Sequence, residues 1–353
     1  MANGPLFEYT GNLHIHTVYS DGGGTAEDIV KAARKVGLDF IILNDHSYQT
    51  QLHLEDEGYH KGVLVMVGSE IGHRFHHYLA FNITRQIDDK NLSPQEVINE
   101  VNRQGGFGFL AHPFEKGMPF LDNGKAYTWN DWSVKGYTGI CIWNFTSRWK
   151  EKVKTLWHGI FHLLFKKYTV QGPSKKTMKT WDELCLTKRA AAIGGSDAHG
   201  ASVKIKFLNI KPFSYEYLLG TINTHILTHC PLEGDGKMDK DVIYNSLRQG
   251  RCFIAHDDIY PAKGFQFYFS RDTDKKRYGM GHEEKFGPGV LVVKSPAHGL
   301  IKIIRNGSLF REAYGNGLSA RIYEKGVYRV EVFRKTPLFG WRPWIFSNPI
   351  YLR

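Results

Sequence analysis

The sequence predicts an α/β protein, in which a barrel of strands and helices is followed by a second, all-β domain. In the first part, nearly continuous apolar runs such as LDFIILNDH alternate with amphipathic helical segments, as in parallel strands that helices cover on both faces. Each of these runs ends in a histidine, an acid or an amide, and the chemistry of α/β barrels lies at the carboxyl ends of the strands. From about Cys252 onward, short segments of alternating hydrophobicity replace the helical pattern, which indicates a β-sandwich.

The first elements of the barrel follow from their residues. NLHIHTV over 12–18 predicts a short strand, and Thr25 begins a helix because Asp28, three residues later, completes a capping box. Gly37 ends that helix, and residues 38–46 form the next buried strand. The alternation continues with strands over 63–70, 106–113, 136–144 and 190–200 and with a helix over 93–106.

The C-terminal region is typical of an immunoglobulin-like sandwich of about seven short strands, separated by Gly, Pro, Asn and Asp. We place the domain boundary within 245–262, after the helical segment DKDVIYNSLRQG. The predicted domains are therefore a barrel over residues 1–250 and a sandwich over residues 251–353.

Composition excludes several classes of protein. Of the 353 residues, 42% are hydrophobic and 14% aromatic, which is enough for a core and excludes a disordered chain. No apolar run approaches the ~20 residues that cross a bilayer, and the start MANGPLFEYTGNLHIH does not resemble a secretory signal. The four cysteines form no C-x-x-C pair, which argues against a disulfide framework and a thiolate zinc site. We therefore expect a soluble, cytoplasmic protein.

A formal net charge of +11 commonly indicates nucleic acid, an acidic membrane surface or an anionic small molecule as partner. Much of it lies in a basic amphipathic insertion at about 145–190, where eleven Lys or Arg residues stand against three carboxylates. A solvated surface explains this charge as well as a flap that attracts phosphate or touches a membrane, and no nucleic-acid-binding motif accompanies it. Within the insertion, Leu156, Ile160 and Leu164 follow helical spacing. Such a stripe is usually core or an oligomer contact, with an interfacial helix or lid as the alternative.

The residues that carry chemistry lie in the first part of the chain. His14 and His16 flank Ile15 in a predicted strand, and side chains two residues apart on a strand point to the same face. A lone pair of this kind is more often structural, but here further histidines and acids follow at the ends of other predicted strands, where structural polar groups are hard to satisfy. The nine candidate metal ligands are His14, His16, Asp21, His46, Glu70, His77, His112, Asp197 and His199.

Histidine and carboxylate ligands without cysteine suit zinc, iron(II) or manganese. One ion uses about four to six ligands, so nine candidates favour two or three divalent ions that share carboxylates. Paired ions typically catalyse hydrolysis, because they lower the pKa of a bound water to about 7 and stabilise oxygens that gain charge in the transition state. The sequence thus predicts a metal-dependent hydrolase that uses a metal-bound hydroxide.

The ordered motifs HIHTVYSDGGG, NDHS, GSEIG, AHPF and GSDAHG, which cover about residues 11–200, resemble the PHP family, the polymerase and histidinol phosphatase superfamily. Membership implies a distorted (β/α)7 barrel, a trinuclear metal centre and, in most members, phosphoesterase activity. By this resemblance Glu70, Asp197 and His199 belong to the catalytic centre, with Glu70 as a bridging ligand. The implied ligand sets are His14, His16, Glu70 and Asp197 for the first ion, Asp21, His46 and His199 for the second, and Glu70, His77 and His112 for the third.

Two details refine this resemblance. In HRFHHYLAF we expect His77 to be the ligand, since the apolar run after it resembles the segment that follows the ligand in phosphatase relatives. His76 would point to the opposite face of a strand. Asp21 stands where some members of the family have histidine, which resembles the phosphoesterase and metallohydrolase branches more than the histidinol phosphatase branch.

The segments TWNDWSVKGYTGICIWN, TWDELCLTKRAAAIGGSDAHG and RPWIFSNPIYLR resemble the CehA/McbA-type metallohydrolases of this family. That branch implies hydrolysis of carboxylic or carbamic esters as the alternative to phosphate esters. The metal ligands cannot separate the two reactions, but a phosphate needs Arg or Lys beside the ions. Lys116 and Arg148, on loops at strand ends, are the candidate substrate-binding residues. The alternative is that both are solvated loop cations.

We lean to a phosphoesterase that acts on a small, anionic ester. The sequence leaves open contact with a membrane surface and self-association of the chain, and it predicts no specific nucleic-acid partner. A catalytically silent barrel that serves as a binding or scaffold protein is the third alternative, which the intact set of ligands disfavours.

Overall fold

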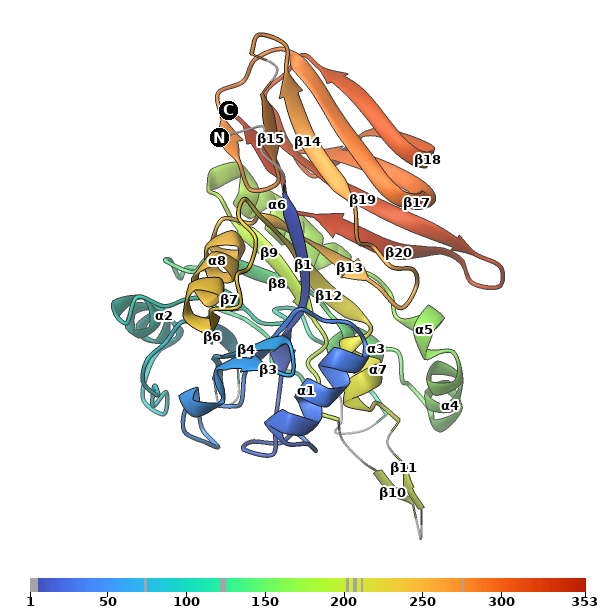
Figure 1. Ribbon diagram of the computed structural model, residues 1–353. Coiled ribbons are helices and arrows are strands. Elements are labelled where there is room, and N and C mark those ends of the chain that lie inside the picture. The colour runs from blue at the N-terminus through green and yellow to red at the C-terminus, as the bar shows by residue number, and fades with distance from the viewer. Residues whose placement is uncertain are drawn as a thin grey trace.

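The computed structural model describes residues 6–353 except 73–74, 121–124, 201–202, 206–207, 211 and 275. As predicted, the chain is a mixed α/β protein (Figure 1). The strands are β1 (Phe7–Ile15), β2 (Phe40–Leu43), β3 (Gly58–His60), β4 (Val63–Val67), β5 (Ser69–Ile71), β6 (Tyr78–Phe81), β7 (Phe107–Leu110), β8 (Gly139–Asn144), β9 (Ala191–Gly195), β10 (Val203–Ile205), β11 (Leu208–Ile210), β12 (Ile222–Thr228), β13 (Cys252–His256), β14 (Gln266–Arg271), β15 (Arg277–Gly279), β16 (Glu283–Glu284), β17 (Gly289–Arg305), β18 (Ser308–Ile322), β19 (Gly326–Thr336), β20 (Gly340–Ser347) and β21 (Ile350–Leu352). The helices are α1 (Ala26–Lys35), α2 (Pro94–Arg103), α3 (Phe145–Lys150), α4 (Leu156–Leu164), α5 (Lys166–Thr169), α6 (Lys175–Thr187), α7 (Tyr215–Leu219) and α8 (Gly236–Arg248), with a 3-10 turn η1 (Leu54–Asp56).

Two sheets build the N-terminal part. β1, β2 and β4 pair in parallel within one sheet, and β7, β8 and β9 pair in parallel within the other. Isolated parallel bridges between Ile15 and Ala198 and between His46 and Glu70 join the two sheets. The loops after β1, β2 and β9 therefore converge. A regular (β/α)7 barrel stays a prediction, because β6 runs antiparallel to β5 and β7, and β12 runs antiparallel to β1.

Local sequence explains where the first helices begin. At the start of α1 the side chain of Thr25 accepts a hydrogen bond from the backbone of Asp28, whose carboxylate accepts one from the backbone of Thr25. The predicted capping box is thus confirmed, and Ser93 and Glu96 form the same arrangement at the start of α2. Each box pairs N–H groups that the first turn of a helix leaves without partners.

The C-terminal region differs from the predicted sandwich. All described strands from β13 to β21 belong to one hydrogen-bonded sheet, so the two separate sheets of a sandwich are not seen among them. Two strands are also longer than predicted, since β17 has 17 residues and β18 has 15. The chain continues in strand conformation through the Gly and Pro residues of SPAHG, where the register shifts between Lys294 and Gly299.

β13 connects the two predicted domains. It pairs antiparallel with β12 on one side and with β20 on the other. Its side chains alternate between cores, since Phe253 and Ala255 join the C-terminal core while Cys252 and Ile254 join the cores of the N-terminal part. The predicted boundary after residue 250 therefore lies beside a strand that belongs to both parts.

The basic insertion forms α3 to α6. α6 packs against β8 and β19, and both carboxylate oxygens of Asp182 accept hydrogen bonds from Arg329 Nε and Nη2, at 2.6 and 2.9 Å. None of the nine residues of α4 is buried. Leu163 is half-buried and packs against the main core, whereas Leu156, Ile160 and Leu164 are exposed, so most of the predicted stripe lies outside a core. The described chain contains no helix long and apolar enough to cross a membrane.

Candidate metal centre

His14 in β1 and His16 just after it lie beside two carboxylates from elsewhere in the chain. One is Glu70 in β5, and the other is Asp197, which follows β9. His14 and His16 are fully buried and lie on the same side of the chain, with ring centroids 5.0 Å apart. His14 Nε2 and His16 Nε2 lie 3.5 and 3.4 Å from Asp197 Oδ1, which follows β9. The sequence predicted that these side chains, two residues apart, share a face, and both rings indeed reach the same acid, Asp197.

Glu70, in β5, is the centre of the cluster. Its side chain is 1% exposed and five imidazoles surround it, three against Oε2 and two against Oε1. The distances to Oε2 are 3.2 Å from His14 Nε2, 3.4 Å from His16 Nε2 and 3.3 Å from His46 Nδ1, and those to Oε1 are 2.9 Å from His77 Nδ1 and 3.1 Å from His112 Nε2. A carboxylate that presents each oxygen to a different set of imidazoles has the geometry of a bridging ligand.

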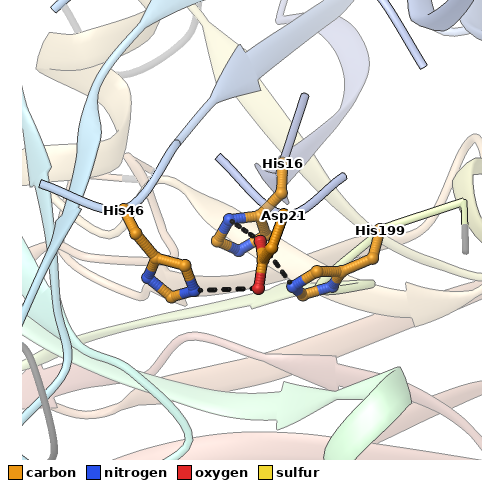
Figure 2. A group of neighbouring side chains, drawn as sticks. All are labelled: His16, Asp21, His46 and His199. Atoms are coloured by element: carbon orange, nitrogen blue, oxygen red, sulfur yellow. Dashed lines mark ion pairs between the residues drawn. The ribbon is translucent and has the colours of Figure 1, made fainter. Parts of the chain in front are cut away.

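A second group forms around Asp21, on the loop after β1. Figure 2 shows this carboxylate between the rings of His16, His46 and His199. Asp21 Oδ1 lies 3.6 Å from His16 Nδ1 and 3.3 Å from His199 Nε2, while Oδ2 lies 3.5 Å from His46 Nε2. His16 therefore contacts both Asp21 and Glu70 and connects the two groups.

The donor atoms fit divalent transition metals. Ligands that bind one ion at ~2.0–2.2 Å lie about 2.8–3.6 Å apart at octahedral to tetrahedral angles, and the nitrogen–oxygen separations around Glu70 are 2.9 to 3.4 Å. Both ring nitrogens of His14 and of His16 are buried without a hydrogen-bond partner. Buried nitrogens without partners are costly, and coordination to a metal ion would satisfy them.

The cluster divides into overlapping groups, in each of which the donor atoms lie within 4.8 Å of one another. All nine predicted ligands are included. Two of them are grouped differently from the sets that the family resemblance implied, since His16 shares a group with Asp21 and His112 shares a group with Asp197. The assignment of residues to individual ions stays a prediction. The four groups are His16, Asp21, His46 and His199; His14, His16 and Glu70; His14, His112 and Asp197; and His46, Glu70 and His77.

Burial and neighbouring charges set the protonation of the cluster. Burial alone would raise the pKa of Glu70, but His14 and His77 hold it well below its usual range. For His16 the balance is reversed, since burial alone would lower its pKa while Asp197 and Glu70 raise it to about 10. The carboxylates are therefore ionised, as metal ligands must be, and a divalent ion would have to displace protons from imidazoles.

The backbone is strained at two of the ligands. His112 and Asp197 have φ angles of 23° and 54°, a region that residues other than glycine rarely adopt and that concentrates at functional sites. At Gly22 a Cβ atom would lie 2.3 Å from the carbonyl oxygen of His16. Only glycine allows the loop to approach so closely, and this approach brings Asp21 to His16.

Lys116 and Arg148, which the sequence suggested for substrate binding, form no hydrogen bond or ion pair with the predicted metal ligands in the described part of the chain. Arg148 Nε donates to the carbonyl of Gly172 at 2.8 Å, and its Nη1 pairs with Glu151. Lys116, four residues after His112, is exposed. Their role in substrate binding stays a prediction.

Lys150 is a cation near the cluster that the sequence analysis missed. Its Nζ lies 3.7 Å from Oε1 of the buried Glu115. Burial alone would lower the pKa of Lys150, but Glu115, Asp197 and Glu70 raise it. Residues two apart on a helix point ~200° apart, so Lys150 and Arg148 lie on different faces of α3. The sequence places both cations in the basic insertion but does not show which face of α3 meets the ligands.

The cluster of imidazoles and carboxylates makes this chain an α/β protein with residues that could bind metal ions. No family model matches it. The uncharacterized protein MJ1587 of Methanocaldococcus jannaschii is 32% identical, over 29% of this chain and 67% of that protein. The chain belongs to the same family as this archaeal protein.

Solved structures show a more distant likeness. One is a two-domain protein containing a predicted PHP-like metal-dependent phosphoesterase from Bacteroides vulgatus, with 17% identity, 99% of this chain and 98% of that chain covered, and a TM-score of 0.48. Another is PsfC from Pseudomonas syringae, with 12% identity, 66% and 87% covered, and a TM-score of 0.41. Both scores lie below 0.5, which is too low to establish a shared fold.

Proposed function

We propose that the chain is a metal-dependent phosphoesterase of the PHP type whose centre holds two or three zinc, manganese or iron ions. The observation that carries this proposal is the buried carboxylate of Glu70, which presents one oxygen to three imidazoles and the other to two. A carboxylate that bridges two ions presents one oxygen to each of them, and the imidazoles beside each oxygen of Glu70 would supply further ligands to that ion. The motifs that resemble the PHP family contain Glu70 and four of these histidines, and His77 lies in the segment HRFHHYLAF between two of the motifs.

Such ions, when bound, acidify water to a nucleophile at neutral pH and withdraw charge from the ester oxygens. The residues of the chain hold the donor atoms in place before any ion arrives. Tyr215 Oη donates to the carbonyls of His16 and His199 at 2.7 and 2.9 Å, which fixes the backbone at both ends of the Asp21 group. A preformed ligand set lowers the cost of organising the site around its ions.

The preference for phosphate rests on Lys150. A phosphate ester brings negative charge to a centre whose carboxylates already offset part of the charge of the ions, and a cation next to the ions compensates for it. Lys150 is the described cation whose ammonium is held beside the cluster, through Glu115. Carboxylic and carbamic esters, which are neutral, need no such group.

A substrate panel tests the proposal. Protein reconstituted with zinc, manganese or iron(II) is assayed with p-nitrophenyl phosphate, bis-p-nitrophenyl phosphate, p-nitrophenyl acetate and an aryl carbamate. We expect phosphate esters to be the better substrates, and Lys150→Ala to lower kcat/KM for them about 10- to 100-fold, as for a lost charge-assisted hydrogen bond, without changing metal content. Lys150→Arg should restore part of the activity, and Lys152→Ala is the matched control.

Three outcomes would overturn parts of this proposal. Activity confined to the acetate or carbamate and unchanged in Lys150→Ala would favour the carboxylic or carbamic ester hydrolase. Loss of phosphatase activity in Lys116→Ala or Arg148→Ala instead of Lys150→Ala would move the anion site to the residues that the sequence suggested. Fully loaded protein without any hydrolysis would favour a binding or scaffold role.

A further inference from the structure

α4 exposes an apolar surface that no described part of the chain covers. Its sequence LWHGIFHLL contains no Asp, Glu, Lys or Arg. Trp157 is 77% exposed, Leu164 74% and Leu156 59%, and Ile160 and Phe161 are exposed as well. Large apolar side chains that gather on a surface in this way mark a contact with another molecule or a membrane.

A second segment extends this surface. Leu338, in the turn between β19 and β20, is 86% exposed. Phe339 in the same turn packs against Phe165 and Tyr168, with ring centroids 5.4 and 5.2 Å apart. Figure 1 shows α4 and α5 at the side of the molecule, near the tip of the β19–β20 hairpin. We call this surface the apolar ridge, made of Leu156, Trp157, Ile160, Phe161, Leu164, Phe165, Leu338 and Phe339.

The two segments that carry the ridge are exclusively basic. Residues 152–168 contain four lysines and no Asp or Glu, and residues 333–342 contain three basic residues and no Asp or Glu. From outside these segments, Asp258 pairs with Lys167 at 3.5 Å and Glu151 lies 4.0 Å from Lys152, so five of the seven cations have no carboxylate partner among the described residues. The cations are Lys152, Lys154, Lys166, Lys167, Arg334, Lys335 and Arg342.

We propose that the apolar ridge docks on the surface of a lipid bilayer that contains anionic headgroups. Trp, Phe and Leu on a short exposed helix with Lys on both sides are the composition of segments that lie in the membrane interface. Each cation near an anionic leaflet adds to the attraction. This docking is independent of the reaction at the metal centre.

The charge also decides between a bilayer and a second copy of the chain. A twofold dimer through the ridge would place the same surface on both subunits and bring two sets of seven cations together without a carboxylate from either segment. An anionic bilayer buries the same apolar side chains and neutralises the charge.

Flotation with vesicles tests the proposal on the full chain. We expect binding to vesicles of phosphatidylcholine with phosphatidylglycerol and much weaker binding to phosphatidylcholine alone. Trp157→Glu should weaken binding about tenfold or more, since it removes a buried apolar contact and adds a repelled charge. Lys154→Ala and Lys335→Ala should each weaken it about fivefold. Leu309→Glu, at an exposed leucine of β18, and Lys276→Ala are the matched controls and should bind as the wild type does.

Further measurements separate the alternatives. Hydrolysis of a soluble aryl phosphate and thermal unfolding should be unchanged in Trp157→Glu, because its side chain is exposed and outside the metal centre. Equal binding to both kinds of vesicle, or no binding, would overturn the proposal. So would light scattering that shows a dimer in the wild type and a monomer in Trp157→Glu, which would make a second copy the occupant of the ridge.

Discussion

Glu115 Oε2 lies 3.6 Å from Nδ1 of His112, on the side of the imidazole that faces away from Glu70. His112 thus has one carboxylate at each ring nitrogen. The side chain of Glu115 is itself held by the backbone N–H of Tyr127 and the hydroxyl of Ser147, at 3.2 Å each. A carboxylate behind a metal-binding imidazole fixes the orientation and tautomer of the ring.

Replacement of Glu115 by Gln should therefore weaken metal binding by about 10- to 100-fold. The measurement is a competition between the protein and a fluorescent chelator for zinc or manganese. Glu183→Gln, at a 62% exposed glutamate of α6, is the control. Unchanged affinity in a folded Glu115→Gln protein would show that Glu115 does not position His112.

Replacement of Glu70 by Ala should remove more than one ion, because this carboxylate faces two sets of imidazoles. Elemental analysis should find more than one equivalent of transition metal per wild-type chain and a loss of at least one equivalent in the variant. Chelation of the wild type should also lower its Tm, since ions that bind only the folded chain stabilise it. Glu216→Ala, at an exposed helix residue, is the control. Active, fully loaded wild-type protein with a single ion would contradict the multinuclear centre.

Asp182→Ala should destabilise the protein by about 3 kcal/mol or less, as measured by urea denaturation. Arg329 is buried, and removal of Asp182 leaves its guanidinium with only Glu331 as an acidic partner, at 2.6 Å. Breaking a buried pair commonly costs about 3–5 kcal/mol, and the remaining partner reduces that cost. The neighbouring Glu183→Ala, at an exposed site, should change stability by less than ~0.5 kcal/mol. Equal effects of both changes would show that the α6–β19 ion pair contributes no stability.

His225 should make stability fall as the pH rises from about 6.5 to about 9. Its Nδ1 lies 2.8 Å from Glu8 Oε1 and its Nε2 lies 3.0 Å from Asp257 Oδ2. Burial alone would lower the pKa of His225, but Asp257 and Glu8 raise it to about 9. The folded state then holds a proton that the unfolded state has released, so the contribution is complete below about 6.5 and lost above about 9.

At about 1.4 kcal/mol per pKa unit, this contribution amounts to at most ~3.5 kcal/mol. Denaturation curves of the wild type and His225→Gln across this pH range measure it, and the difference between the two should shrink as the pH rises. His298→Gln, at an exposed histidine, should run parallel to the wild type. A difference that grows with pH would mean that His225 is neutral in the folded protein.

Most of the candidate metal ligands could be predicted because they end or follow an apolar run, and strand ends converge whatever the details of the sheet. His77 instead stands before the run YLAF, and Asp21 lies on the loop after β1. The choice between His76 and His77 also agrees with the geometry, since His77 contacts Glu70 while the ring of His76 packs on Trp129 with centroids 5.1 Å apart. The resemblance of the run after His77 to phosphatase relatives made this choice, and strand alternation did not, because β6 begins only at Tyr78 and His76 has a φ of 60°.

Other features depend on contacts between distant segments and left no local signal. Lys150 ends α3 and Glu115 lies on the loop after β7, so the two residues meet only in the folded chain. The strand β17 was divided in the prediction because Gly and Pro usually end strands, whereas here β18 pairs with it on both sides of the shift in register. Its long partner, and not its own residues, holds it extended.

Since β13 supplies side chains to the hydrophobic cores on both sides, the N-terminal and C-terminal parts should melt together. If denaturant detaches β13, both β12 and β20 lose their hydrogen bonds to it at the same time. A partly folded form in which only one part stays intact therefore has a high free energy. A chain cut after residue 250 would keep every metal ligand and still lose the strand that covers β12. The two parts therefore act as one cooperative folding unit, and neither can be exchanged as a module without rebuilding that edge.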